Sequence, residues 1–521
     1  MARRVAVAGS PWRAAAVVAA VAGVAWLGGG HYARRQVAAQ LPALQIDGAA
    51  PAVGAALAAA DAQARQSPSA STIGALAAAY HAHQRPAAAI AVYRIAAALA
   101  PTDPSWTYLR GVLHEERGDS DEAQAAFTSV VGARPGHGHA WFRLGELAFK
   151  RGRLDEAAAA YARARDAAPV PPFVPPGGAP RQVTPLAPYA RLGLARVALD
   201  RGDAAAAVGE VGAVIAAYPG IGAARGLLRE AERAAGGSND PPGAARGFAS
   251  PYVPPADPAV DAVIATSVHT DVLLKFAGLA TRAGDAPWRE FLVRRALAAA
   301  PDDRHVVMEM ATMLQAQGRP AEALDFLRRH ETLAPGDHHT LVEQGRCLLD
   351  LGRLAEAEAV LRRAVDYRDA AAEYNLASAL DRQDRWDEAR AHYERALSID
   401  PYHVRSMNNL AIGLDRRGQT ATAMALLERA IAIAPGNGEF YVNYGTVLIR
   451  QGRIADAVRV LDEAVALSPR DANAHNNRGI ALARHGDLPR ARDAFARAVD
   501  LDPRHEGARG NLAQVTAALG R

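Results

Sequence analysis

Five asparagines in the C-terminal half of the chain are equally spaced and could bind a polypeptide. They are separated by 34 residues each: Asn375, Asn409, Asn443, Asn477 and Asn511. If every stretch of 34 residues folds in the same way, the five side chains lie along one line of the molecule. A carboxamide both donates and accepts hydrogen bonds, so such a row suits the backbone of an extended peptide. The alternative is that each asparagine supports only local hydrogen bonds.

A row of arginines follows the same spacing, seven residues after each of the first four asparagines. It consists of Arg382, Arg416, Arg450 and Arg484. Guanidinium groups in such a row could contact acidic groups of a ligand. The alternative, which we favour, is that a basic residue near the end of each helix complements the helix dipole.

Residues with the spacing of a catalytic or metal site are missing. No P-loop, GxSxG or HExxH motif occurs. The single cysteine, Cys347, cannot form an internal disulfide or a Cys₄ metal site, and it is expected to be a packing residue. Histidines occur in close pairs, but no carboxylate or cysteine cluster accompanies them. We therefore predict no enzymatic activity, no metal and no cofactor.

A pattern of small and apolar residues repeats along most of the chain. Counting from Gly445 as an anchor, Gly452 follows after seven residues, Ala457 after twelve, Leu461 after sixteen and Pro469 after twenty-four. Eleven anchors occur, at Ala77, Gly111, Gly145, Ala195, Ala277, Ala311, Gly345, Ala377, Ala411, Gly445 and Gly479. Ten of the eleven keep the alanine and ten keep the proline, so the register of the repeat is well defined.

Each repeat has the features of two helices joined by a tight turn. The glycine provides a left-handed end for the first helix, and the proline ends the second. The small anchor and the later alanine allow the two helices to approach closely. One such pair cannot bury its apolar face alone, so the pairs must stack into an all-α solenoid.

This pattern resembles the tetratricopeptide repeat family, over residues 70–221 and 270–505. The resemblance implies a right-handed superhelix whose concave groove binds partner proteins or peptides. The asparagine row is similar to the one in the repeats of O-linked N-acetylglucosamine transferases, where it faces the inner groove. By that resemblance, the five asparagines are assigned to peptide contact.

Interruptions of the pattern suggest the domain organisation. A first array of four repeats spans 70–235, with a Pro-rich insertion at 171–188 and a final cap helix. A Gly/Pro-rich linker spans 236–269, and a second array of seven repeats spans 270–505. Residues 506–521 are predicted to form a capping helix, and 36–69 an Ala-rich juxtamembrane spacer. Ligand contact is expected within 370–511, because the first array lacks the asparagine row and has Leu109 and Arg143 at two of the equivalent positions.

The N-terminus, residues 1–35, is expected to be a transmembrane anchor. Residues 14–33 carry no formal charge, and arginines flank them on both sides. The alternative is a cleaved secretory signal. Three arginines before the segment against two after it favour a single-pass protein with its body in the periplasm or outside the cytoplasm.

The net charge of +4 belongs to this segment and not to the repeats. Residues 1–35 contain five arginines and no acid, whereas the remainder has 54 basic and 55 acidic residues. Nucleic acid is therefore not an expected partner, and no small-molecule substrate is evident. The sequence predicts a membrane-tethered scaffold or adaptor for proteins. The alternative is a periplasmic chaperone or assembly subunit of an envelope machinery, such as cytochrome maturation, secretion or polysaccharide export.

Overall fold

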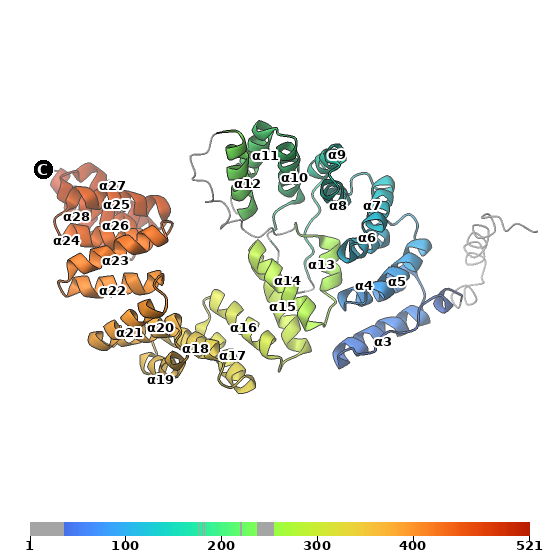
Figure 1. Ribbon diagram of the computed structural model, residues 1–521, viewed down its shortest axis with the longest axis horizontal. Helices are drawn as coiled ribbons and strands as arrows, with labels where there is room; N and C mark the ends of the chain where they lie inside the picture. The colour runs from blue at the N-terminus through green and yellow to red at the C-terminus, as the bar shows by residue number, and fades with distance from the viewer. Residues whose placement is uncertain are drawn as a thin grey trace, which may run out of the picture. The chain divides into compact units, whose positions relative to one another are not determined.

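The chain folds into antiparallel helix pairs. A computed structural model describes residues 36–175, 177–179, 181, 183–218, 221–236 and 255–520 (Figure 1). Within these ranges every regular element is helical. The predicted all-α solenoid of helix-turn-helix repeats is therefore confirmed.

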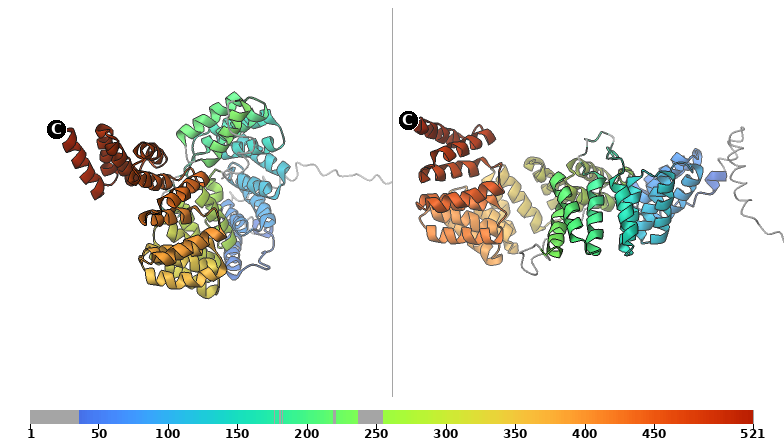
Figure 2. Two further views of the ribbon diagram at one scale, coloured as in Figure 1. Left: turned by 60° about the vertical axis from the view of Figure 1, so that its left-hand side comes forward. Right: turned by 90° about the horizontal axis from the view of Figure 1, so that it is seen from above.

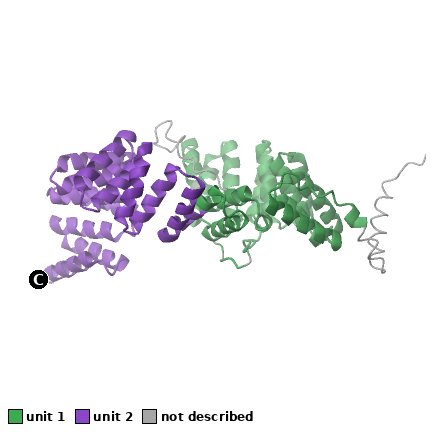
Figure 3. Ribbon diagram, turned by 90° about the horizontal axis from the view of Figure 1, so that it is seen from below, with its two compact units in different colours: residues 1–309 green, residues 310–521 purple. Residues whose placement is uncertain are grey.

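The chain divides into two compact units, residues 1–309 and 310–521 (Figure 3). The stretch 236–269, which the sequence predicts to be a Gly/Pro-rich linker, contains a short helix, α13 (Pro258–Ile264). This helix contacts α4 and α6 of the first unit.

The first unit contains the helices up to the start of α16. In chain order they are α3 (Pro51–Gln66), α4 (Ala70–Ala82), α5 (Pro86–Leu99), α6 (Ser105–Arg117), α7 (Ser120–Ala133), α8 (Gly138–Lys150), α9 (Leu154–Arg165), α10 (Leu186–Asp200), α11 (Ala204–Ala217), α12 (Gly222–Ala234), α13, α14 (Thr270–Ala283) and α15 (Ala286–Ala299). The boundary between the units falls inside α16 (Arg304–Ala316).

The second unit continues the helix pairs to the C-terminus. Its helices are α17 (Pro320–Leu333), α18 (His338–Asp350), α19 (Leu354–Ala364), the 3₁₀ turn η2 (Val365–Tyr367), α20 (Ala370–Asp381), α21 (Trp386–Ile399), α22 (Val404–Arg416), α23 (Thr420–Ile433), α24 (Gly438–Arg450), α25 (Ile454–Leu467), α26 (Ala472–His485), α27 (Leu488–Leu501) and α28 (Glu506–Leu519). Two further views show that α24 to α28 lie side by side in chain order (Figure 2).

The anchor residue sets the distance between the two helices of a pair. A Cβ atom built on Gly445 of α24 would lie 2.5 Å from Cγ of Leu461 on α25. At Gly479, a Cβ atom would lie 2.5 Å from the ring of Phe495. Such distances leave no room for a side chain, so glycine here permits close packing of the second helix against the first. Ala457 and Ala464 on the facing side of α25 are fully buried.

The turn inside each repeat uses a left-handed residue. The nine glycines predicted to end first helices all have positive φ, from +70° at Gly152 to +92° at Gly486. Two repeats without this glycine place Gln84 and Asp384 there, both with φ of +60°. The turn geometry is thus kept even where the residue type is unfavourable.

The N-terminal part of the chain differs from its predicted organisation. The stretch 36–69, expected to be a spacer, contains α3, which packs on α4 and buries Val53, Leu57 and Ala64. The predicted transmembrane segment, within residues 1–35, lies outside the described residues. Among the helices that the structure describes, none is long and apolar enough to cross a membrane.

One histidine of the first unit is buried in its neutral form. His81 of α4 is 7% exposed, and its ring meets that of Tyr93 edge to face at 6.1 Å. Burial, helped by the positive charge of Arg143, lowers the pKa of His81 to about 4. An unfolded chain would protonate this ring near pH 6.5. The first unit is therefore stabilised by a neutral His81 above that pH, and it loses this contribution as the pH falls toward 4.

We expect Gly445→Ala to lower the free energy of unfolding of the second unit by about 1–3 kcal/mol, because the new methyl group would overlap Leu461. Native-state hydrogen exchange of the α24 amides measures this free energy in the full chain. The matched control is Gly510→Ala in α28, where no atom lies within 4 Å of the added Cβ. The control should be neutral or slightly stabilising. Equal effects of both changes would contradict the packing role of the anchor.

We expect His81→Gln to reduce the acid sensitivity of the first unit. Between pH 7 and pH 5, titration of His81 alone should cost the wild-type chain about 2 kcal/mol, and the variant lacks this loss. Hydrogen exchange of the α4 amides at both pH values, corrected for intrinsic exchange rates, measures the difference. A pH dependence that is the same in both proteins would show that the ring is not held neutral.

Candidate functional site

The asparagine row in the second unit forms hydrogen bonds between successive repeats. We call the residue two positions before each anchor a ladder residue. The bonds join a ladder residue to a side chain 35 positions earlier, on the preceding first helix, and we call each such pair a rung. Three rungs occur: Asn409 Nδ2 to Tyr374 Oη (3.4 Å), Asn443 Nδ2 to Asn408 Oδ1 (2.9 Å) and Asn511 Nδ2 to Asn476 Oδ1 (3.0 Å).

The other two asparagines of the row lie differently. Asn477 donates to Oγ1 of Thr446 (3.1 Å), which also belongs to the preceding first helix. Asn375 is 8% exposed, and its amide has no hydrogen bond to the described residues. In the repeat before Asn375 the residue equivalent to Asn408 is Val342, three residues before the anchor Gly345, and its apolar side chain cannot accept a hydrogen bond. The row therefore becomes a continuous polar line only from Asn409 onward.

The row keeps unused hydrogen-bonding capacity. Asn409, Asn443, Asn477 and Asn511 are all half-buried, which leaves part of each side chain at the surface. The Oδ1 atoms of Asn443 and Asn511 accept no hydrogen bond from the described residues. A polypeptide N–H group could therefore bind to these oxygens while the rungs stay intact.

Sequence analysis missed the rung partners. Asn408 and Asn476 are 2% and 7% exposed, and each sits directly before a ladder residue. The two asparagines are 68 residues, or two repeats, apart, and this spacing could have predicted them as a pair. The repeat between them has Val442 at the same position, which interrupts the pattern. Tyr374 lies three residues before its anchor, as Tyr108 does in the second repeat, but the repeats between them have other residues at that position. Partners of one row can differ in residue type because a hydroxyl and a carboxamide both accept a hydrogen bond.

The arginine row contacts the ends of preceding first helices. Arg382 Nη1 donates to the carbonyl of Leu349 (2.6 Å), and Arg484 Nη1 to that of Ile449 (3.1 Å). Arg450 pairs with Asp415, and Arg416 is exposed. These contacts agree with the alternative in which the arginines complement helix ends. The argument for ligand binding therefore rests on the asparagines.

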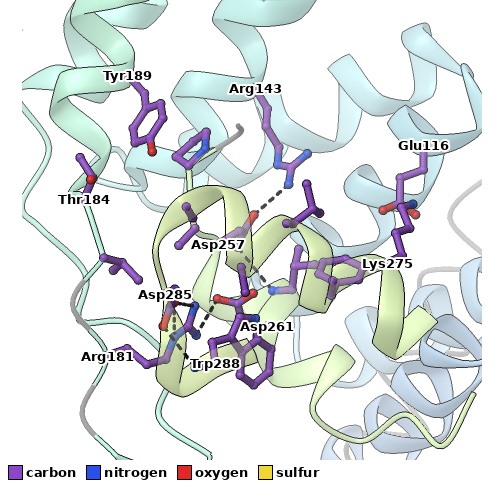
Figure 4. A pocket seen from close by; sticks show the side chains of 18 residues that line it. Glu116, Arg143, Arg181, Thr184, Tyr189, Asp257, Asp261, Lys275, Asp285 and Trp288 are labelled. Atoms are coloured by element: carbon purple, nitrogen blue, oxygen red, sulfur yellow. Dashed lines mark hydrogen bonds and ion pairs between the residues drawn. The ribbon is translucent and has the colours of Figure 1, made fainter. Parts of the chain in front are cut away.

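A rung of the same geometry occurs in the first unit, where we did not expect one. Arg143, a ladder residue on α8, donates through Nε to Tyr108 Oη (3.0 Å), again 35 positions earlier. Both residues also bind the side chain of Asp257, which precedes α13. Arg143 Nη2 lies 2.9 Å from Asp257 Oδ2, and the Tyr108 hydroxyl donates to the same oxygen. This rung therefore holds a carboxylate from a segment that is distant in sequence, and Figure 4 shows the contact of Arg143 with Asp257.

Asp257 is buried at this rung and Arg143 is half-buried, with 10% and 23% of their side chains exposed. Burial opposes ionisation of Asp257, but Arg143, His139 and the Tyr108 hydroxyl together outweigh it and keep the pKa of the carboxyl below its ordinary value. The guanidinium of Arg143 also donates to Glu115 (2.6 Å). Burial raises the pKa of Tyr108 well above its ordinary value, so the hydroxyl keeps its proton and can donate it. Arg143 and Tyr108 thus bind one carboxylate together.

A second ion cluster lies one helical turn along α13. Arg181, from the Pro-rich insertion, donates to Asp261 Oδ2 of α13 (2.9 Å) and to Asp285 Oδ2 (2.8 Å). Its guanidinium stacks 4.6 Å from the ring of Trp288. Burial raises the pKa of Asp261 to about 6 in spite of Arg181. Between the two clusters lies a cavity of about 290 Å³, lined also by Glu116, Lys275 and Tyr189 (Figure 4).

The cysteine and the histidine pairs give no sign of metal chemistry. Cys347 is fully buried, its Sγ accepts from Gln315 Nε2 (3.1 Å), and burial raises its pKa. His83 binds the backbone amide of Val268, and His139 the backbone carbonyl of Ala256. Within the ranges that the structure describes, no group of three or more histidine, cysteine or acidic residues could hold a metal ion.

Comparisons with known proteins place most of the repeats in one family. Models of the tetratricopeptide repeat match residues 108–170, 179–220 and 442–506, and a second such model matches 368–435. A model of anaphase-promoting complex, cyclosome, subunit 3 matches residues 287–364. A search of curated proteins found no significant match.

Solved structures with a similar arrangement have low sequence identity. One is a tetratricopeptide repeat protein from Parabacteroides merdae (17% identity, 47% of this chain and 98% of that one, TM-score 0.40). Another is the Cut9–Hcn1 hetero-tetramer of the APC/C (12% identity, 84% and 94%, TM-score 0.42). A third is yeast Tom70 (15% identity, 87% and 88%, TM-score 0.36).

The matched models coincide with the helix pairs of both units. Residues 442–506 cover most of α24 and all of α25 to α27, in which the anchor glycines pack against Leu461 and Phe495. Residues 108–170 cover α7, α8 and α9 and most of α6. The chain belongs to the tetratricopeptide repeat family.

Proposed function

We propose that this protein is a membrane-tethered scaffold that binds extended segments of partner proteins along the ladder residues of 370–511. One observation carries the proposal. In the first unit, a rung with the same spacing of 35 residues holds the Asp257 side chain, which comes from a segment distant in the sequence. The ladder residues of the second unit occupy the same position in their repeats as Arg143 does in its own. They are therefore suited to contact a polypeptide.

The residue types on the second-unit rungs indicate what kind of ligand would bind. Arg143 carries a full positive charge and holds a carboxylate, whereas Asn409, Asn443 and Asn511 are neutral. A neutral amide gains no ion pair from an acidic side chain, but it matches the donors and acceptors of a peptide backbone. Rungs in successive repeats would then contact an extended segment at several points. Binding of this kind needs no catalytic group.

The N-terminal segment supports tethering as part of the same proposal. Its apolar stretch Ala14–Leu27, flanked by arginines, has the composition of a membrane anchor, and its charge balance favours a body outside the cytoplasm. A tether would concentrate the ladder residues at the membrane surface. Partners would then be exported or membrane-bound proteins.

We expect a photo-crosslinker placed at Asn443 to trap a partner in intact cells, because this side chain is half-buried on the ladder with a free carbonyl oxygen. The matched control is a crosslinker at Thr422, which is exposed on the second helix of a neighbouring repeat. The measurement is the appearance of discrete adducts by mass shift. One stoichiometric adduct indicates a scaffold, and many different adducts indicate a chaperone. Identical adducts from both positions would contradict binding at the ladder.

We expect the triple change Asn409→Ala, Asn443→Ala and Asn477→Ala to reduce capture of that partner about tenfold or more, since several backbone hydrogen bonds would be lost. Helicity should be retained, although each lost contact between repeats costs about 1 kcal/mol of stability. A control with three exposed second-helix changes, Thr422→Ala, Arg459→Ala and Arg492→Ala, should leave capture unchanged. Unchanged capture by the ladder variant would refute the proposal.

We expect the full chain to stay in the membrane pellet after alkaline carbonate extraction, and a chain lacking residues 2–35 to move to the supernatant. The intact mass of the extracted protein separates an anchor from a cleaved signal, since cleavage removes the apolar segment. Recovery of the uncleaved full chain in the supernatant would contradict the tether.

A further inference from the structure

The segment 255–269 lies against the first unit in the manner of a bound peptide. Its helix α13 contacts α4 and α6, the first helices of the first two repeats. Val260, Val263 and Ile264 are buried against them, at 6%, 4% and 3% exposure. Among the helices described, α13 has seven residues and does not form a helix pair of the repeating type. The segment therefore occupies the surface of the repeats without continuing them.

The repeats recognise the backbone of this segment as well as its side chains. His139 Nε2 donates to the carbonyl of Ala256 (3.0 Å), and His83 Nε2 accepts from the amide of Val268 (3.1 Å). Arg295 donates to the carbonyls of Ser267 (2.5 Å) and Thr266 (2.9 Å). Side-chain contacts to backbone groups along a segment are the usual mode by which a peptide is held.

The most specific contact is made by the residue that starts α13. Asp257 caps the helix by accepting from the amides of Ala259 and Val260 through Oδ1 (3.2 and 3.4 Å). Its other oxygen, Oδ2, binds the Arg143–Tyr108 rung. One carboxylate thus starts the helix and pairs with the repeats, which fixes both the position and the conformation of the segment.

The fit between the segment and the repeats leaves space. The cavity of about 290 Å³ is lined on one side by Asp257, Val260 and Asp261 of the segment. On the other sides lie Arg143 and Lys275, both ladder residues by position. The Oδ1 atom of Asp261 has no hydrogen-bond partner among the described residues. The segment and the repeats therefore enclose a polar pocket beside Asp257 and Asp261.

We propose that the first unit contains a peptide-binding site for an acidic, helix-starting segment, and that residues 255–269 are its occupant within the same chain. The site recognises an aspartate at the helix N-cap through Arg143 and Tyr108, with buried aliphatic residues on the following turn. A partner segment of the same chemistry binds there when residues 255–269 are displaced. This site is separate from the ladder of 370–511 and takes a ligand with a different recognition group.

The test uses a labelled peptide with the sequence of residues 255–269 and three forms of the full chain. In the first form, residues 256–266 are replaced by a Gly/Ser linker of equal length, which empties the site. The second form carries Asp257→Asn and Asp261→Asn, which weakens the occupant with little change in shape. The third is the wild-type chain, in which the occupant competes at high effective concentration. Fluorescence anisotropy measures binding, and circular dichroism measures helicity.

We expect the emptied chain to bind the peptide at least about tenfold more tightly than the wild-type chain. Adding Arg143→Gln, or using a peptide with Asp257→Asn, should weaken that binding about tenfold or more, because one partner of a buried ion pair is lost. Arg382→Gln is the matched control in the second unit and should have no effect.

Two results would overturn the inference. One is that folded emptied or weakened chains bind no peptide, or bind it independently of Arg143 and Asp257. The other is that both altered chains lose the helicity of the first unit and the added peptide does not restore it, which would show that the segment is part of the core. Because the ladder asparagines are unchanged in every form, partner capture through residues 370–511 is tested independently.

Discussion

The close approach of the two helices in each repeat is the constraint on which the rest of the structure depends. A side chain at Gly445 or Gly479 would overlap Leu461 or Phe495, so each pair can pack in only one register. Identical pairs then stack with identical offsets. As a result, ladder residues reach a side chain on the preceding first helix, as Arg143, Asn409, Asn443, Asn477 and Asn511 do. The packing of the helices alone places the two side chains of each rung next to each other.

The same geometry serves different chemistry in the two units. The first unit places an arginine and a tyrosine on its rung and holds a carboxylate. The second unit places amides there and keeps carbonyl oxygens unused at Asn443 and Asn511. A repeat fold can in this way change its ligand class by single substitutions, because the backbone that positions the rung does not change.

The regular part of this fold could be predicted from sequence, and the irregular part could not. The period of 34 located the helix pairs, and the glycines with positive φ lie where the pattern placed them. Segment 236–269 was read as a linker because it is rich in glycine and proline, and α13 within it was missed. Its docking depends on Arg143 and Tyr108, which are 114 and 149 positions away from Asp257, and no local pattern reveals such a pair. The rung partner Tyr374 was missed because a tyrosine recurs at this repeat position only at Tyr108, six repeats earlier.

The central claim is that ladder positions of this chain bind polypeptide, and the Arg143–Asp257 contact tests it most directly. A double-mutant cycle with Arg143→Gln and Asp257→Asn, read from native-state hydrogen exchange of the α13 amides, measures the coupling between the rung and the segment. We predict a coupling free energy of more than about 1 kcal/mol, since the two groups form a partly buried, hydrogen-bonded ion pair. Additive effects, with a coupling below about 0.3 kcal/mol, would show that the rung does not hold the segment and would contradict the account.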